Sequence, residues 1–165
     1  MNDAHLHLIL NHLPIIIPII GLLIMIGGLL LSSEIVKRTA YFIFILGAIV
    51  AFPAFYSGEG AEEVVENLPS INENLIKIHE EFAETFSVLC YVLGAFSLLG
   101  LWSNYYKKSF SNSISYVAIL FCIITLYYAK LTGTTGGVIR HTEIRTSSGT
   151  SNTTLETNEN EKEDN

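Results

Sequence analysis

Five histidines, and the glutamates near them, are the residues of this 165-residue chain whose types and spacing could do chemistry. Three histidines stand in the stretch HLHLILNHLP, one lies in IHEEFAE, and one follows TGTTGGVIR. Imidazole is a ligand for iron, copper and zinc, while carboxylates add hard oxygen ligands that suit iron or manganese. No pair of these residues has a spacing that is diagnostic of a metal site. The chemistry therefore depends on whether the fold brings the separate segments together.

The elements that must position these residues are four apolar segments without Asp, Glu, Lys or Arg. They cover residues 4–33, 39–58, 85–106 and 109–129. Each reaches the roughly 20 residues that a helix needs to cross a hydrocarbon layer of about 30 Å. A soluble bundle would show a polar stripe along each helix, and these segments have none. The sequence thus predicts an all-α integral membrane protein built as a four-helix bundle.

The predicted spanning helices lie at about residues 8–31, 39–57, 76–102 and 113–132. A short outer amphipathic helix is predicted at about residues 61–68, between the second and third spanning helices. Gly58 and Gly60 would supply the turn before it, and Pro69 would end it. Residues 1–145 form the transmembrane domain. The polar, acidic tail of residues 146–165 has almost nothing to bury and is predicted to be disordered.

Basic residues set the predicted orientation of the chain. Lys37 and Arg38 follow the first helix, and Lys107 and Lys108 follow the third. The positive-inside rule makes both of these loops cytoplasmic. The two termini then face outward, which in a bacterium is the periplasmic side of the inner membrane. All five histidines share this outer side with most of the glutamates, whereas the cytoplasmic loops contain only Glu34.

Proline and cysteine have predicted structural roles in these helices. Pro14 suits a helix that starts near His12, because proline is tolerated in the first helical turn. Pro18 removes a backbone hydrogen bond one turn later and is predicted to kink or loosen the helix. Cys90 and Cys122 lie in the middle of helices, and we predict that they are small apolar packing residues.

A candidate metal centre is assembled on the outer side from several segments. His79 shares a helical stripe with apolar residues of the third helix, so it is predicted to face into the bundle. TGTTGG is predicted to form a tight turn that returns His141 over the outer mouth of the bundle. The predicted metal ligands are His12, His79, His141, His7, Glu59, Glu62 and Glu63. The residues predicted to support them or to form salt bridges are Arg140, Glu66, Asn11 and Glu80.

Two forms of this centre are open. In one, haem b is held between His12 and His79 as axial ligands on facing helices. In the other, a non-haem iron, copper or zinc ion uses the carboxylates as well. The many glutamates favour the non-haem form, because a haem pocket is mostly apolar and has little use for them.

The start of the chain resembles a known family. The spacing His7-x-x-x-x-His12-x-Pro14 is similar to the His-Pro-x-x-Val-His-Phe-Pro signature of a widespread family of bacterial four-helix membrane proteins, catalogued as a domain of unknown function. Leu8 stands where that family usually has proline, and Asn11 where it has an apolar residue.

The resemblance extends over about residues 5–145. It includes the histidine that begins the third helix, His79, and the Gly-Gly pair that precedes His141. The stretches SGEGAEE and GGVIRHTEI resemble a subgroup with outer-side SGExAEE and GGxIRH motifs. Members of the family are sometimes fused to Rieske-type redox domains, so the resemblance implies a redox or electron-transfer context.

The leading functional prediction is therefore a membrane protein with a His/Glu metal centre at its outer face, associated with membrane lipid and with other membrane or periplasmic redox proteins. The alternative is an accessory structural subunit of a larger membrane complex, without a cofactor, in which Arg140 pairs with Glu62 or Glu63. A transporter is disfavoured, because no charged residue lies at the bilayer midplane. The net charge of −7 disfavours nucleic-acid binding. Whether the protein is an enzyme stays open.

Overall fold

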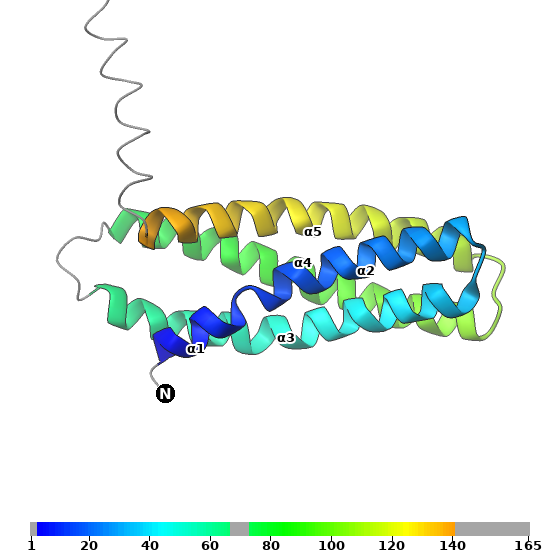
Figure 1. Cartoon of the computed structure of the whole chain (residues 1–165), viewed down its shortest axis with the longest axis horizontal. Helices are drawn as coiled ribbons and strands as arrows, with labels where there is room; N and C mark the ends of the chain where they lie inside the picture. The colour runs from blue at the N-terminus through cyan, green and yellow to red at the C-terminus, as the bar shows by residue number, and fades with distance from the viewer. Residues whose placement is uncertain (1–2, 67–72, 141–165) are drawn as a thin grey trace, which may run out of the picture.

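The computed structural model describes residues 3–66 and 73–140 of the chain, drawn in Figure 1. The described residues form α1 (Asp3–Leu10), α2 (Leu13–Leu30), α3 (Glu34–Glu66), α4 (Glu73–Tyr105) and α5 (Ser111–Arg140). The acidic tail of residues 146–165, His141, Pro69 and the last two residues of the predicted 61–68 helix lie outside the described residues.

Helices α1 and α2 follow one another along one side of the bundle, and α3, α4 and α5 complete four antiparallel columns (Figure 1). Four stretches are long and apolar enough to span a membrane: Ala4–Leu30, Glu34–Val64, Glu73–Tyr105 and Ser111–Ile139. Large apolar side chains such as Leu30, Ile35 and Phe52 point outward from them. Such a surface is compatible with an apolar solvent such as the interior of a membrane. The predicted all-α bundle with four helices of spanning length is confirmed.

The columns pack in a ring, in which α2 contacts α3, α3 contacts α4, α4 contacts α5, and α5 returns to α2. The short α1 packs on α3. Helix α4 is therefore diagonally opposite the column of α1 and α2. The main core cluster consists of Met25, Ala40, Tyr41, Phe44, Leu93, Ala118 and Cys122. Cys90 and Cys122 are buried free thiols, in agreement with their predicted packing role.

A break at Asn11 and His12 divides the first column into α1 and α2. A helix does start near His12, as Pro14 indicated, because His12 is the N-cap of α2 and Pro14 lies in its first turn. The predicted single helix at about residues 8–31 is wrong in its start, since the column begins at Asp3 and is divided. Pro14 lacks an N–H for the carbonyl of Leu10, and its ring clashes with that carbonyl in a continuous helix, so α1 ends there. Pro18 is accommodated inside α2, and the thiol of Cys122 lies 3.5 Å from the Pro18 carbonyl oxygen as a donor.

The separate outer helix predicted at residues 61–68 does not form as such. Residues 61–66 are the last turns of α3, which runs without interruption through Gly58 and Gly60, the predicted turn. A glycine inside a helix costs only about 1 kcal/mol relative to alanine. Each further residue of α3 adds a backbone hydrogen bond, which offsets this cost.

The predicted tight turn at TGTTGG is also wrong, because α5 continues through this run to Arg140. Its threonines are accommodated by hydrogen bonds to the preceding helical turn. Thr134 Oγ1 donates to the Lys130 carbonyl at 2.8 Å, and Thr135 Oγ1 lies 3.0 Å from the Leu131 carbonyl. The predicted third and fourth spanning helices were also too short. Helix α4 starts at Glu73 and not at about residue 76, and α5 ends at Arg140 and not at about residue 132.

The two loops at the other end of the bundle close in the same way. Ser32 and Lys107 have positive φ angles of 50° and follow the last turns of α2 and α4. The residue after each of them donates its N–H to a carbonyl of the preceding helix. Ser33 donates to the Gly28 carbonyl and Lys108 to the Ser103 carbonyl, both at 2.9 Å. These are Schellman motifs, which satisfy the last helical carbonyls and reverse the chain sharply.

Candidate functional site

Polar side chains gather at both ends of the bundle. We call the end formed by α1, the end of α3, the start of α4 and the end of α5 the histidine end (Figure 1). The opposite end carries the loops between α2 and α3 and between α4 and α5, and we call it the lysine end. The histidine end is considered first, because the sequence placed the candidate metal ligands there.

His7 is held against α3 by two oxygen atoms. Its Nδ1 lies 3.0 Å from the Ala54 carbonyl oxygen and 3.3 Å from the Ser57 hydroxyl. Ser57 Oγ in turn donates to the same Ala54 carbonyl at 3.0 Å. A carbonyl oxygen can only accept, so Nδ1 of His7 carries the proton. In the neutral imidazole, Nε2 then keeps its lone pair.

His79 is held against α5 in an equivalent manner. Its Nδ1 lies 3.0 Å from Thr135 Oγ1. The single hydroxyl proton of Thr135 is donated to the carbonyls of Leu131 at 3.0 Å and Thr132 at 3.1 Å. The Thr135 oxygen therefore accepts, and Nδ1 of His79 is the donor. Nε2 of the neutral His79 is again the nitrogen with the free lone pair.

Small residues make room for both imidazoles. A Cβ atom added at Gly136 would lie 3.0 Å from Cε1 of His79, and one added at Gly58 would lie 3.4 Å from Cε1 of His7. Both histidines are half-buried. They come from columns that are diagonal in the bundle.

Two buried oxygen atoms from residues close in sequence to these contacts have no hydrogen-bond partner. They are Oδ1 of Asn11 and Oγ1 of Thr132. Asn11 is one turn from His7, and Thr132 is one turn before the Thr135–Gly136 pair that contacts His79. A buried polar atom without a partner is costly, so it indicates a place that another polar group or a bound ligand completes.

The other predicted ligands are not gathered around this pair. His12 is exposed as the N-cap of α2, and Glu59, Glu63 and Glu80 are exposed, whereas Glu62 is half-buried. Within residues 3–66 and 73–140, no group of three His, Cys, Asp or Glu side chains could hold a metal ion. His141 and the side chains of Arg140 and Glu66 lie outside what the structure describes. The structure therefore gives His7 and His79 the inward positions.

Ser57, Thr132, Thr135 and Gly136 were missed as site residues in the sequence. The signal for the last three was the TGTTGG run, whose threonines and glycine meet His79 only because the run is helical. Ser57 lies fifty positions from His7, and no local pattern indicates that contact.

Replacing Thr135 with valine should destabilise the protein by about 1 to 2 kcal/mol, because it leaves the Nδ1–H of His79 without an acceptor. Valine has nearly the same shape as threonine, so the packing is kept. Thr134→Val is the matched control, since Thr134 is exposed and bonds only to its own helix. Unfolding in detergent should separate the two variants. Equal stability of both would contradict the proposed role of Thr135, and nitrogen NMR of the imidazoles would report the tautomer directly.

The lysine end holds a second polar cluster, which includes residues that the sequence did not single out. Lys37 is buried and donates to Glu34 Oε1 at 2.6 Å and to Asn112 Oδ1 at 2.7 Å. Asn104 donates to the other Glu34 oxygen and accepts from Arg38 Nε at 2.6 Å. This cluster ties the start of α3 to α4 and α5, and within it the carboxylate of Glu34 pairs directly with Lys37.

Comparisons of this chain with family models, with curated proteins and with solved structures found no match. The resemblance to the four-helix membrane family thus stays a prediction from the residues that carry it. The geometry of the two ends is the ground for the functional proposals that follow.

Proposed function

We propose that this chain is an integral membrane protein of the bacterial inner membrane, with its histidine end on the periplasmic side, and that it binds a transition metal there through His7 and His79. The observation that carries the proposal is that Nδ1 of each imidazole lies within hydrogen-bond distance of an oxygen atom on a neighbouring helix. Metal-ligating histidines characteristically donate the other ring N–H to a carbonyl or another oxygen, which orients the ring and raises its basicity. Ala54 and Thr135 supply these acceptors here.

Position and surroundings support the same proposal. The two imidazoles come from opposite columns, so an ion between them would link α1 and α4 across the bundle. The unpartnered oxygen atoms of Asn11, one turn after His7, and of Thr132, one turn before Gly136, are available for a water or a ligand. Neutral imidazoles with neutral oxygen neighbours suit copper or zinc better than the harder manganese.

Glu59 and Glu63 are exposed, so the carboxylates favour a non-haem centre less strongly than the sequence alone indicated. Haem b with His7 and His79 as axial ligands would use the same two nitrogen atoms and the same glycine neighbours. A redox-active metal in either form would give the protein the electron-transfer role that the family resemblance implies. We propose the imidazole pair as the ligand set common to both forms.

The test is the metal content and the absorption spectrum of the full-length protein purified in detergent, oxidised and then reduced with dithionite. We expect His7→Ala and His79→Ala each to lower metal affinity at least about tenfold, as loss of a ligand does. His5→Ala is the matched control, because His5 is exposed on the same short helix. A Soret band that sharpens on reduction would identify haem, and a colourless metal would appear in elemental analysis.

Substitution of His12 distinguishes this proposal from the larger set of ligands that the sequence predicted. Because His12 is exposed and caps α2, we expect His12→Ala to keep the metal. Loss of metal in His12→Ala, with metal retained in His7→Ala, would contradict the His7–His79 assignment. His141→Ala tests whether a third histidine joins the pair.

A structural role without a cofactor is the second candidate, and it is favoured by the hydrogen bonds that His7 and His79 already make within the bundle. In that case the purified wild-type protein contains no metal. Both alanine variants should then lower the free energy of unfolding by about 1 to 3 kcal/mol, because they remove the hydrogen bonds that join α1 to α3 and α4 to α5.

A further inference from the structure

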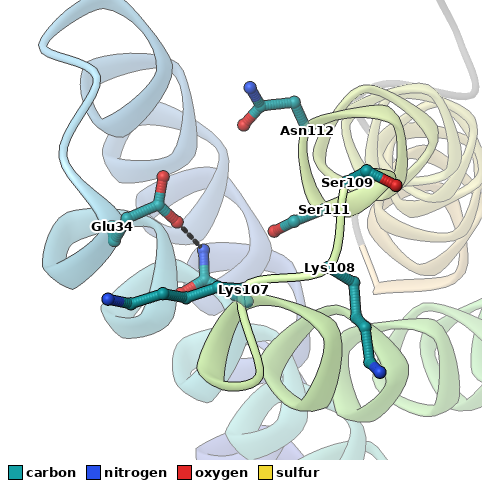
Figure 2. A pocket seen from close by; sticks show the side chains of 7 residues that line it. Glu34, Lys107, Lys108, Ser109, Ser111 and Asn112 are labelled. Carbon is teal, nitrogen blue, oxygen red and sulfur yellow. Dashed lines mark hydrogen bonds between the residues drawn. The ribbon is translucent and has the colours of Figure 1, made fainter.

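A polar cavity opens at the lysine end, at the opposite end of the bundle from the histidine pair (Figure 2). Its volume is about 270 Å³, and it lies between the start of α3 and the loop that joins α4 to α5. The residues that line it are Glu34, Asn104, Lys107, Lys108, Ser109, Ser111 and Asn112. The cavity is large enough for a tetrahedral oxyanion with part of the group that bears it.

Ser111 gives the first indication of a ligand. This residue is 8% exposed, and its hydroxyl has no hydrogen-bond partner. Its backbone N–H is already donated to the Lys108 carbonyl at 3.0 Å. Figure 2 shows the hydroxyl pointing into the space between Asn112 and Lys107. A buried hydroxyl of this kind is costly unless an acceptor completes it.

The start of α5 gives the second indication. The Ile114 N–H makes a bond to the Phe110 carbonyl, and α5 begins at Ser111. Between Ser111 and Ile114, the first-turn amides of Asn112 and Ser113 have no partner within a regular helix, and they lie where the helix dipole is positive. No acidic residue lies in this first turn. Helix starts of this type bind phosphate oxygens through their backbone N–H groups.

The charges around the cavity favour an anion. The carboxylate of Glu34 is already engaged by Lys37 and by Asn104, so its charge is balanced within the cluster. Lys107 and Lys108 are exposed. In Figure 2 the side chain of Lys108 points away from Glu34, and its Nζ lies 5.6 Å from the centre of the Trp102 ring. Both long side chains have exposed ammonium groups that can turn toward a bound anion.

Exposed aromatic residues surround this end of the bundle: Trp102, Tyr105, Tyr106 and Phe110. Tryptophan and tyrosine are enriched at the level of lipid headgroups. The cavity is thus at the depth where the phosphate of a phospholipid lies, close to the ends of α4 and α5.

We propose that this cavity binds a phosphate group, with the Ser111 hydroxyl and the first-turn amides of α5 as neutral donors and Lys107 and Lys108 as cations. The phosphate could come from the headgroup of an anionic phospholipid or from free inorganic phosphate. The two sources share the same recognition chemistry, and the proposal is independent of the metal proposed at the histidine end.

The test uses the full-length protein in detergent and three probes: phosphatidylglycerol, diacylglycerol, which lacks the phosphate, and inorganic phosphate. Binding of the lipids is measured by native mass spectrometry and that of inorganic phosphate by calorimetry. We expect the double variant Lys107→Gln/Lys108→Gln to lower affinity for the bound phosphate at least about tenfold. Ser111→Ala, which keeps every charge, should lower it about threefold to tenfold.

The matched control is Lys77→Gln/Lys130→Gln, which removes two exposed lysines from the histidine end. It changes the net charge of the protein by the same amount as Lys107→Gln/Lys108→Gln. This control should bind as the wild type does, and diacylglycerol should not bind. Binding of phosphatidylglycerol alone assigns the site to lipid, and binding of inorganic phosphate with the same dependence on Ser111 assigns it to free phosphate. If neither phosphate probe binds, if Ser111→Ala binds as tightly as the wild type, or if the control pair weakens binding equally, the proposal is overturned.

Discussion

Replacing Glu34 with alanine should destabilise the protein by about 3 kcal/mol, because it leaves a buried ammonium group without its counter-ion. Lys37 is 2% exposed, and its Nζ lies 2.6 Å from Glu34 Oε1. After the substitution only the Asn112 carbonyl oxygen, at 2.7 Å, would remain as a partner. Unfolding of the purified protein in detergent measures the effect.

The reverse substitution should be much milder. Glu34 is 49% exposed, so Lys37→Met leaves a carboxylate that water and Asn104 still solvate. We expect Lys37→Met to destabilise by about 1 kcal/mol, the upper end for an exposed pair. The double variant Glu34→Ala/Lys37→Met should recover most of the stability lost in Glu34→Ala. Additive losses in the double variant would show that the burial of Lys37 is not what makes Glu34 important.

The second large effect is expected for Gly100→Ala, at the contact between α3 and α4. A Cβ atom at this position would overlap Cε1 and Cζ of Tyr41 and lie 2.8 Å from its hydroxyl oxygen. Tyr41 is fully buried, and its hydroxyl is 2.9 Å from Ser115 Oγ on α5. The ring cannot move without breaking that hydrogen bond or separating the helices. We expect a loss of about 2 to 3 kcal/mol, as for other overpacked cores.

Gly27→Ala is the matched control for this prediction. A Cβ atom there meets nothing within 4 Å, so the substitution should be neutral or stabilise by up to about 1 kcal/mol through helix propensity. Thermal unfolding of both variants in the same detergent compares them directly. Similar stabilities would mean that α3 and α4 separate easily, and that the close contact at Gly100 does not hold them together.

The sequence alone determined the class of fold, because each spanning helix is specified within itself. In an apolar layer every backbone N–H and carbonyl must be bonded inside its own segment, so about 20 uncharged apolar residues are enough to predict a helix. The start of α2 at His12 was predictable for a similar local reason, the position of Pro14. The ends of α3 and α5 were not, because glycine and threonine are weak signals that helix continuity overrides.

Only the tertiary structure decided which polar residues meet. His7 contacts a carbonyl 47 positions away, His79 contacts a hydroxyl 56 positions away, and Lys37 contacts Asn112 across 75 positions. These contacts depend on the rotation of each helix about its axis and on the break at residues 11–12, which turns His7 toward α3 and leaves His12 outside. The sequence predicted that the histidines share one end of the bundle, but helix packing selected the two that face inward.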